Sequence, residues 1–451
     1  MGAPHRPEAL VVVGLGFGDE GKGATVDWLA DSRRAQGRPA ALAVRFNGGA
    51  QAAHNVVTPD GREHTFSQFA SATFCGVPTH LTRDVLVEPM MLAAEARALS
   101  GLGVDDPLEL VTLDPDALVT TPIQVAANRA REDRRGDRRH GSCGKGIGET
   151  RWYDEASTRR LAAGQYWGNL AAPGDVTGTA VRVRDCRDRR RLIAQLDAMA
   201  RCYAPLLAGT EHGHRSVGEL ADLLSDFGAG VRLGSDARIA AALTRGPVLF
   251  EGAQGVLLDE WRGFHPHTTW SVTEPSAARR LLARFSVRPT VIGVTRTYHT
   301  RHGAGPLPSQ TQAELPERHN GTGRYQGAWR VGHLDLVLLR YAARACGPID
   351  RIAITHLDAD PAGDQVGLVD HYLDQAGRAV HDLALGPTQD LDHQTRLTRL
   401  VSQATPVTRT ATGPERVRAI EQTLRAPTLV TATGPSRTER ALRDVPDSAA
   451  A

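Results

Sequence analysis

The chain has 451 residues, and its 53 basic and 51 acidic side chains give a formal net charge of +2, so it offers no global positive field for a nucleic acid partner. No apolar run approaches the roughly 18 residues that span a bilayer, and the first ten residues lack the apolar core of a signal peptide. The five cysteines are scattered without a C-x-x-C pair, which predicts a reduced, cytoplasmic protein with no disulfide framework.

The predicted elements begin with a strand, a glycine loop and a helix. Residues 9–16 read ALVVVGLG, a continuous apolar run typical of a buried parallel strand. The loop GFGDEGKG follows at 16–23, and residues 23–37 have apolar side chains at helical spacing. A second strand is predicted in AALAVRFNGG, residues 40–49. This order of elements predicts the start of a doubly wound α/β sheet.

Later apolar runs predict further strands, each ending in glycine or polar residues. They are PVLFEGAQG (247–255), RPTVIGVTRTY (288–298), DRIAITHLD (350–358) and APTLVTATGP (426–435). Helices are predicted between them, for example in residues 332–347 and 413–426. Because open α/β sheets bind ligands at the carboxyl ends of their strands, these polar ends are the candidate ligand loops.

No internal repeat or domain boundary interrupts the pattern. We therefore expect one large α/β domain over residues 8–440, with a central, mainly parallel β-sheet flanked by helices and related to the P-loop folds. The charged run at residues 129–141 is expected to be a solvated helix end or a mobile loop. Residues 441–451 are expected to be a disordered tail.

The first glycine loop has the spacing G-x-x-x-x-G-K of a phosphate-binding loop. However, Gly23 stands where Ser or Thr would ligate Mg²⁺, and Asp19 and Glu20 bring negative charge into the loop. A carboxylate among phosphates is tolerated when a divalent cation lies between them, and it can also act as a general base. The loop also fits the dinucleotide fingerprint G-x-G-x-x-G, but the second strand lacks the acidic residue that would bind a ribose.

Lysine is almost absent from the chain. Of the 53 basic residues only Lys22 and Lys145 are lysines, and both lie in G-K-G. An ammonium is compact enough to enter a crowded phosphate site that a planar guanidinium cannot enter. We interpret both lysines as placed for phosphate chemistry, with chance as the alternative.

In six or seven blocks between residues 14 and 435 the chain resembles the adenylosuccinate synthetase family. GDEGKG with the following ATVDWLA resembles the start of that family, and NGGAQAAHNVV is similar to its second glycine loop. GSCGKGIG, FEGAQGVLLD and TRHGAGPLP are similar to its next three blocks. GTGR with RVGHLD resembles the amino-acid loop, THLD the guanine-reading segment, and TATGP the last nucleotide contact.

This resemblance implies a carbon–nitrogen ligase of purine biosynthesis that joins IMP and L-aspartate using GTP. GTP phosphorylates the 6-oxo group of the purine, and the amine then displaces phosphate. Asp19 matches the general base beside the γ-phosphate and also a ligand of Mg²⁺. His54 matches the general acid, Lys22 the lysine that neutralises phosphate, and the carbonyl of Ala53 a second metal contact.

The resemblance also implies which residues bind the substrates. The residues matched to GTP contacts are Gly18, Gly21, Lys22, Gly23, Ala53, His54, Asn55, Arg330, Thr355, Asp358, Thr433, Gly434 and Pro435. Those matched to the purine monophosphate are Asp19, Gln51, Cys143, Arg159, Gln254, Leu258, Thr269, Gly303 and Arg324. Those matched to the amine donor are Thr322, Arg324 and Arg330.

Three of these residues also have simpler interpretations. Gln254 could stabilise a turn, and Thr269 could cap a helix. Asp358 could also be a helix N-cap. Its carboxylate, however, can accept from both the N1–H and the 2-amino group of guanine, a pairing that adenine does not offer.

Several positions depart from the family pattern. Gln51 replaces an asparagine, and His356 replaces a lysine. Cys143 replaces a threonine that binds phosphate, and a thiol is a weaker hydrogen-bond donor than a hydroxyl. The arginine that the neighbouring subunit of the expected homodimer would donate has no clean register, and Arg159 or Arg160 is the nearest candidate.

The largest departure lies in GTGRYQGAWRVGHLD, residues 321–335. The family has four consecutive arginines here, two of which hold the carboxylates of aspartate. Only Arg324 keeps its place, and Arg330 follows after about three extra residues. Either the extra residues loop out and return Arg330 to the pocket, with aspartate as the donor, or the pocket is less cationic and takes a different donor.

We interpret the chain as a GTP-dependent ligase that adds an amine to the 6-position of a purine nucleotide, with IMP and L-aspartate as the default substrates. A first alternative is a paralog that acts on a modified purine nucleotide or uses another amine donor in a specialised pathway. A second is a catalytically silent nucleotide-binding regulator, against which the intact Asp19, Lys22 and His54 argue. The expected partners are small-molecule nucleotides, an amino acid and a second copy of the chain, with neither a nucleic acid nor a membrane.

Overall fold

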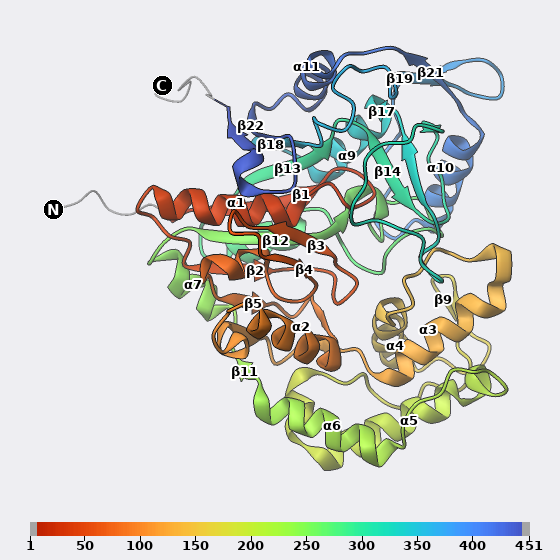
Figure 1. The fold of residues 1–451 in the computed structure, drawn as a ribbon. Coiled ribbons are helices and arrows are strands. Elements are labelled where there is room, and N and C mark those ends of the chain that lie inside the picture. The colour runs from red at the N-terminus through yellow and green to blue at the C-terminus, as the bar shows by residue number, and fades with distance from the viewer. Residues whose placement is uncertain (1–6, 444–451) are drawn as a thin grey trace.

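A sheet of ten strands forms the centre of the protein, whose computed structural model describes residues 7–443 (Figure 1). The strand order is β11-β7-β5-β2-β12-β1-β13-β18-β22-β23, and every neighbouring pair is parallel except β22 with β23. The strand bounds are β1 Ala9–Gly14, β2 Leu42–Arg45, β5 Thr79–Leu81, β7 Val111–Leu113, β11 Arg232–Leu233, β12 Val248–Gly255, β13 Thr290–Arg296, β18 Arg351–Thr355, β22 Thr428–Ala432 and β23 Arg440–Leu442.

The central strand β1 is buried on both faces, which is why its sequence is apolar at every position. Leu10 and Val12 pack into the apolar cluster that contains helix α1 (Lys22–Ala35). Val11 and Val13 point to the opposite face because side chains alternate along a strand. The helices of that face are α7 Ala237–Leu243, α8 Ser276–Ala283, α9 Leu336–Cys346, α10 Leu391–Gln403 and α11 Gly413–Leu424.

A second apolar cluster packs against the β11–β7–β5 end of the sheet, in the lower part of Figure 1. Its largest fully buried side chains include Trp152, Tyr153 and Tyr203. The helices that build it are α2 Pro89–Gly101, α3 Pro122–Arg135, α4 Ile147–Arg159, α5 Arg189–Leu207 and α6 Val217–Gly230. Thr121 and Ser216 form capping boxes at the starts of α3 and α6, so these helices begin where their sequences provide a side-chain acceptor.

Short strands complete the fold around the main sheet. Two antiparallel pairs are β3 (His54–Val57) with β4 (Glu63–Phe66) and β9 (Tyr166–Trp167) with β10 (Leu170–Ala171), and β6 (Leu86–Val87) pairs parallel with β8 (Leu118–Val119). A three-stranded sheet contains β14 His299–His302, β15 Gln310–Thr311 and β16 Trp329–Gly332. A four-stranded sheet contains β17 Leu334–Asp335, β19 Leu368–Leu373, β20 Ala379–Val380 and β21 Thr405–Arg409.

The predicted strands and helices are confirmed. The structure also gives more detail for the charged run at residues 129–141 and corrects the start of the predicted tail. Residues 129–135 end helix α3, and a 3₁₀ turn at Gly136–Arg138 and a loop follow. The predicted tail begins too early, because Ala441 and Leu442 belong to β23; residues 444–451 lie outside the described residues. Within residues 7–443 no helix is long and apolar enough to cross a membrane.

Candidate active site

A cavity of about 690 Å³ opens at the carboxyl ends of six neighbouring strands of the main sheet. Its wall includes the loops that follow β1 and β2, the last residues of β12, β13 and β18, and the turn after β22. Helices α3 and α4 and residues 316–323 provide the facing wall. The cavity therefore lies where parallel strands gather their polar loops, as the strand-end argument predicts.

Most of the predicted site residues meet in this one cavity. The predicted residues that line it are Gly18, Asp19, Gly21, Lys22, Gly23, Gln51, Ala53, His54, Asn55, Cys143, Gln254, Leu258, Thr269, Thr322, Thr355, Asp358, Gly434 and Pro435. Those that do not line it are Arg159, Gly303, Arg324, Arg330 and Thr433. Most residues predicted to bind the nucleotides thus come together from distant parts of the sequence, whereas two of the three residues predicted for the amine donor lie elsewhere.

The first glycine loop reaches the cavity through a series of left-handed residues. Gly18 has a φ of 97°, Asp19 61° and Gly21 90°. Aspartate is one of the few residues with a side chain that tolerates this region. Helix α1 starts directly after Gly21 without a side-chain cap or an acidic first turn, so its N-terminal N–H groups and its dipole favour an anion at this point.

Glu20 occupies three hydrogen-bond donors of this loop. Its carboxylate accepts hydrogen bonds from the N–H groups of Gly16 (2.9 Å) and Gly18 (2.8 Å) and lies 2.7 Å from the Nζ of Lys22. Both Glu20 and Lys22 are buried. The loop therefore holds an anion of its own between the N–H groups and the lysine, a role that sequence reasoning did not assign to Glu20.

Asp19 lies on the cavity wall beside two basic side chains. Its carboxylate is 3.5 Å from Nε2 of His302, and Nε of Arg296 donates to its main-chain oxygen at 2.7 Å. Burial raises the pKa of Asp19, and the charges of His302, Arg296 and Lys22 oppose that increase. A carboxylate with a raised pKa is a stronger proton acceptor once it is ionised, which suits a general base.

His54 is oriented by a buried carboxylate. Its Nδ1 is 2.5 Å from Oε1 of Glu251, and Glu251 also accepts from the N–H and hydroxyl of Ser71. Burial raises the pKa of Glu251, but the hydrogen bond and charge of His54 outweigh this and lower it, so the carboxylate is ionised at neutral pH. Glu251 therefore holds a proton on Nδ1 and leaves Nε2 available to the cavity.

Glu251 was not among the predicted residues, although it lies in the block FEGAQG at the end of a predicted strand. Burial lowers the pKa of His54 to about 4. An anionic phosphate in the cavity would raise that pKa, because opposite charge favours the imidazolium form. His54 is thus placed to carry a second proton when a phosphate is next to it.

Gln51 presents an amide that has no partner among the described residues. Both its Nε2 and its Oε1 are buried without a hydrogen bond within residues 7–443. A buried polar group without a partner calls for a ligand or a water molecule. On the same cavity wall, burial raises the pKa of Cys143, which keeps this side chain a neutral thiol and a weak donor.

Lys145 does not share the position of Lys22. Its Nζ donates to the main-chain oxygen of Ala50 at 2.9 Å, and the residue does not line the main cavity. This hydrogen bond braces the loop that carries Gln51. Lys22 thus lines the main cavity, and its phosphate role stays a prediction, whereas Lys145 has a structural contact instead.

At the other end of the cavity, the segment after β18 is tied to the first loop. The hydroxyl of Thr355 donates to the main-chain oxygen of Glu20 at 2.8 Å. Asp358 lines the cavity, and residues 359–366 form no helix, so the N-cap interpretation is wrong. No helix starts at Thr269 either. Both side chains remain available to a ligand.

The arginines predicted for the amine donor point away from the cavity. Arg324 pairs with Glu211 and, at 3.3 Å, with Asp133, and its side chain is 59% exposed. Arg330 donates to Oε1 of Gln310 at 3.0 Å and to the main-chain oxygen of Gly305 at 2.8 Å. The expectation that Arg330 returns to the pocket is therefore not met in this structure.

Other cationic side chains take part in the wall instead. Those that sequence reasoning missed are Arg135, Arg296, Arg301, Arg318 and Arg440. Arg301 is held by three main-chain carbonyls, and Arg296 pairs with Glu317 at 3.1 Å. Arg318 forms no ion pair with another described residue. The signal for Arg296 and Arg301 was their place at the end of a predicted strand and in TRHGAGPLP.

Arg159 ends helix α4 outside the cavity. Its guanidinium lies 3.5 Å from the centre of the Trp167 ring, and its Nη1 donates to the main-chain oxygen of Glu155. Arg160 follows as the left-handed C-cap of the helix. Neither arginine reaches the cavity of its own chain, so a contribution from either would have to come from a second copy.

Sequence comparisons connect the chain to one family of proteins. A family profile described as adenylosuccinate synthetase matches residues 11–441. The adenylosuccinate synthetase of Desulfatibacillum aliphaticivorans is 31% identical over 380 residues, which cover 80% of this chain and 80% of that protein. The enzyme of Chlorobium phaeobacteroides is 28% identical over 474 residues, which cover 96% of this chain and 97% of that protein.

Two solved structures are similar to the whole chain. A fully ligated adenylosuccinate synthetase from Plasmodium falciparum superposes with a TM-score of 0.75 at 18% identity, covering 96% of this chain and 99% of that one. A succinoaminodeoxyadenylate synthetase from cyanophage S-2L, bound to dGMP and dATP, gives a TM-score of 0.53 at 15% identity, covering 97% and 96%. At these identities the likeness confirms the fold, a single α/β domain around a mostly parallel sheet.

Proposed function

The chain belongs to the adenylosuccinate synthetase family, and from this membership we infer how its cavity performs the family reaction, the GTP-dependent ligation of L-aspartate to IMP. The protein is a carbon–nitrogen ligase of purine biosynthesis that binds GTP. The observation that carries the assignment of residues is that separate sequence blocks meet at six adjacent strand ends. The position of a residue along this row of strand ends therefore indicates which substrate it contacts.

We assign the two ends of the cavity to the two nucleotides. Asp358, Gly434 and Pro435 form the guanine end, and the first glycine loop with Lys22 lies next to it and takes the phosphates. Gln51 and Gln254 lie on the wall that faces IMP. This arrangement brings the γ-phosphate of GTP toward the 6-oxygen of the purine, with Asp19 and His54 between them.

Asp19 acts as the base in the first step. It removes the N1 proton of IMP, and the 6-oxygen then attacks the γ-phosphorus of GTP while the bond to the β–γ bridging oxygen breaks and GDP leaves. His54, oriented by Glu251, donates from Nε2 to an oxygen of the transferring phosphoryl group. In the second step the amine nitrogen attacks C6, the bond between C6 and the phosphoryl oxygen breaks, and phosphate leaves with the proton that the amine loses.

The residues present fit the Mg²⁺ that the family reaction requires. The carboxylate of Asp19 and the main-chain oxygen of Ala53 both belong to residues of the cavity wall, and oxygen ligands suit Mg²⁺. When bound, the ion neutralises charge that develops on the phosphate oxygens. Asp19 would then hold the metal with one oxygen and accept the proton with the other.

A paralog with another amine donor is the second candidate. It is favoured by the outward positions of Arg324 and Arg330, which leave no paired guanidinium forks from that loop for two carboxylates. We also propose a cytoplasmic homodimer, in which Arg159 of one copy approaches the site of the other. A different amine donor would change only the second step of the reaction and leave the phosphoryl transfer unchanged.

The test is a matrix of substrates. The protein is incubated with GTP, Mg²⁺, one of several purine monophosphates and one of several amines, and the adducts are identified by mass. Adenylosuccinate formed from IMP and aspartate confirms the proposal, whereas an adduct with a monocarboxylate amine or with ammonia supports the second candidate. The absence of GTP turnover with every nucleotide would support the silent regulator.

A further inference from the structure

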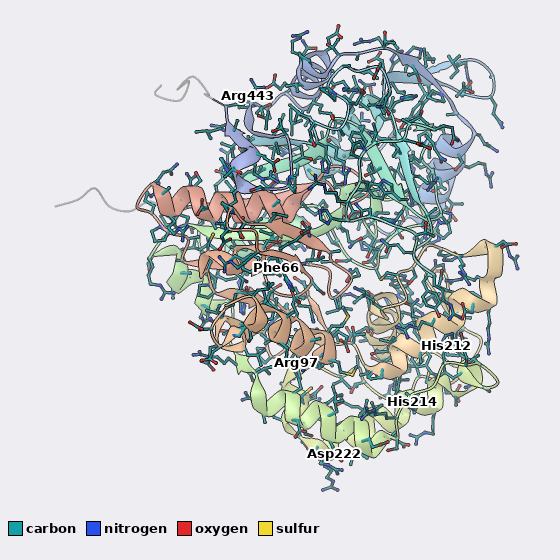
Figure 2. All side chains as sticks on the ribbon, in the orientation of Figure 1. Phe66, Arg97, His212, His214, Asp222 and Arg443 are labelled. Atoms are coloured by element: carbon teal, nitrogen blue, oxygen red, sulfur yellow. The ribbon has the colours of Figure 1, made fainter. Side chains whose placement is uncertain are left out.

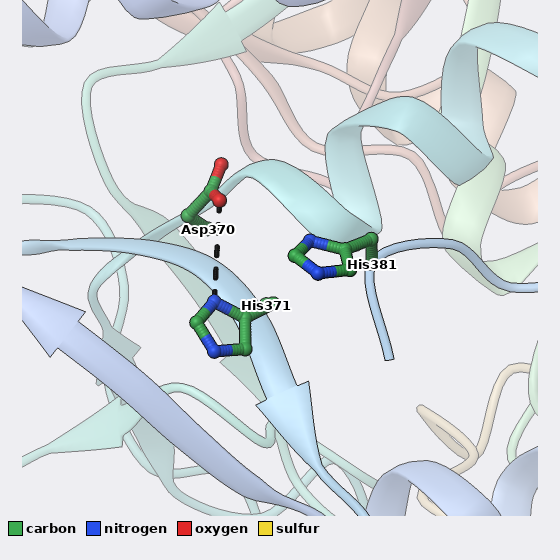
Figure 3. Close-up of side chains that lie close together, drawn as sticks. All are labelled: Asp370, His371 and His381. Atoms are coloured by element: carbon green, nitrogen blue, oxygen red, sulfur yellow. Dashed lines mark ion pairs between the residues drawn. The ribbon is translucent and has the colours of Figure 1, made fainter. Parts of the chain in front are cut away.

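The hairpin formed by β19 and β20 carries a cluster that plays no part in the ligase site. Figure 3 shows the carboxylate of Asp370 and the imidazole rings of His371 and His381 close together. Each side chain offers one possible ligand atom, and these three atoms lie within 4.8 Å of one another. None of the three residues lines the main cavity.

Strand register explains why the two rings meet. In the antiparallel ladder Tyr372 is opposite Val380 and Leu373 is opposite Ala379. Continuing this register by one residue sets His371 opposite His381, so that both side chains stand on one face. Their ring centres are 4.9 Å apart with an angle of 30° between the planes.

A β-bulge brings the carboxylate to the same place. Successive residues of a regular strand point to opposite faces, so Asp370 and His371 would normally diverge. The pairing of β19 with β21 shifts register between Val369 and His371, and Asp370 is the extra residue. A bulge re-aims a side chain in this way, and a carboxylate oxygen of Asp370 lies 4.0 Å from Nδ1 of His371.

Arg340 holds the backbone of the cluster. This residue of helix α9 donates to the main-chain oxygen of Asp370 and, at 2.9 Å, to that of His381. It therefore ties the two ligand-bearing strands to the helix beneath them and fixes their spacing. Its contact with the Asp370 side chain is longer, at 3.7 Å, and leaves the carboxylate accessible.

The ring nitrogens are available to a ligand. Within residues 7–443 the only ion pair of either ring is the 4.0 Å contact of His371 with Asp370. Two imidazole nitrogens and one carboxylate oxygen suit late first-row divalent ions, whereas Mg²⁺ and Ca²⁺ prefer oxygen ligands alone. The side chain of Asp370 is 55% exposed, so water can complete the coordination.

We propose that Asp370, His371 and His381 form a binding site for a late first-row divalent transition ion such as Zn²⁺, separate from the Mg²⁺ of the ligase reaction. Tetrahedral coordination at about 2.1 Å sets ligand atoms about 3.4 Å apart. The three atoms, now within 4.8 Å, reach that spacing by small side-chain rotations. The ion clamps β20 onto β19 and so stabilises the folded chain.

Two other clusters of the described chain are less suited to an ion. In the cluster of Asp133, Glu211 and His212, both carboxylates already pair with Arg324. In the cluster of His80, Asp114 and Asp236, Asp236 pairs with Arg284, and Nδ1 of His80 is hydrogen-bonded to Thr112. In the β19–β20 cluster the two imidazole rings have no arginine partner among the described residues, and the one ion pair that Asp370 makes with an arginine is the 3.7 Å contact with Arg340.

The proposal is tested by calorimetric titration of the untagged, chelator-treated full chain with ZnCl₂ in the presence of millimolar Mg²⁺. We expect one site per chain whose affinity falls at least tenfold in His371→Asn and in His381→Asn. The melting temperature should rise with Zn²⁺ in the wild type and not in these variants. Without metal, the variants should melt as the wild type does, which separates lost binding from misfolding.

His214→Asn is the matched control. His214 is a half-buried histidine between α5 and α6, at the end of the molecule opposite β19 (Figures 1 and 2). This variant should bind Zn²⁺ as the wild type does. A second readout is the imidazole ¹⁵N resonances of His371 and His381, which should shift on addition of Zn²⁺. Unchanged affinity in both variants, or resonances that do not move, would overturn the proposal.

Discussion

The two walls of the cavity hold their side chains in different ways. On the nucleotide side, residues follow the ends of buried strands, and hydrogen bonds such as Thr355 to Glu20 connect one strand end to the next. On the amine-donor side, Arg324 sits in a loop of altered length and is paired with Glu211 at the surface. A side chain at the end of a buried strand is held in one position by that strand, whereas a side chain in a loop of altered length can be present in the sequence and still point away from the cavity.

The largest effect is expected on the strand-end side. Asp19→Asn keeps the shape of the side chain but cannot accept a proton, so kcat should fall by roughly 10²–10⁴, the usual contribution of a positioned general base. GTP should still bind, because the N–H groups of the loop are unchanged. Turnover is measured with saturating GTP and IMP, and binding by calorimetry. Near-normal turnover would show that another group removes the proton.

The second test measures how much Asp335, which follows the altered loop, contributes to the stability of the fold at different pH. Asp335 caps helix α9 from a buried position, where burial raises its pKa to about 6, while Tyr372 and two N–H groups oppose the increase. Because the folded state favours the protonated carboxyl, its contribution to stability is complete below about pH 4 and is lost as the pH rises through about 6. The difference between the pKa of about 6 in the folded chain and the ordinary aspartate pKa of 3.8 corresponds to about 3 kcal/mol of unfolding free energy.

Asp335→Asn should remove this part of the pH dependence. Urea unfolding between pH 4 and pH 7 gives the free energy of unfolding of the variant and of the wild type at each pH. If Asp335→Asn and the wild type have parallel profiles, the carboxyl is not perturbed as the structure indicates.

The third test concerns Asp358, which we assign to guanine binding on the wall built from strand ends. Asp358→Asn replaces an acceptor of two hydrogen bonds from guanine with an amide. The preference for GTP over ATP should shrink by roughly 10–150-fold, the loss expected for a hydrogen bond to a charged group. Xanthosine triphosphate should become a better donor, since its 2-oxo group accepts from the amide. Equal use of GTP and ATP by the wild type would refute the assignment of Asp358.

The smallest effects are expected in the altered loop. Arg324→Ala removes an exposed ion pair with Glu211, and Arg330→Ala removes hydrogen bonds to Gln310 and Gly305. None of these partners lines the cavity, so each variant should change the KM for aspartate less than about fivefold, the range of an exposed ion pair. Arg318→Ala removes a guanidinium from the cavity wall and should raise this KM more than either. A sharp rise in Arg330→Ala would instead show that the loop turns inward when the substrates bind.

The same contrast explains what the sequence could predict. Apolar runs of buried strands predicted β1, β12, β13, β18 and β22, and the polar residues after them predicted the nucleotide wall. The contact of His54 with Glu251 joins residues 197 positions apart, and it depends on the pairing of β2 with β12, which no local pattern encodes. The direction of Arg324 depends on partners in loops whose paths the sequence does not specify.

The scarcity of lysine gives the protein an unusual chemical surface. Lys22 is 3% exposed, and the ammonium of Lys145 is bonded to the oxygen of Ala50. Because these are the only lysines in the chain, acylating reagents, amine cross-linkers and lysine-directed conjugating enzymes find almost no side-chain target on its exterior. Modification of a lysine in this protein is therefore an event at one of two glycine-rich loops, and modification of the buried Lys22 would report on whether the first loop has opened.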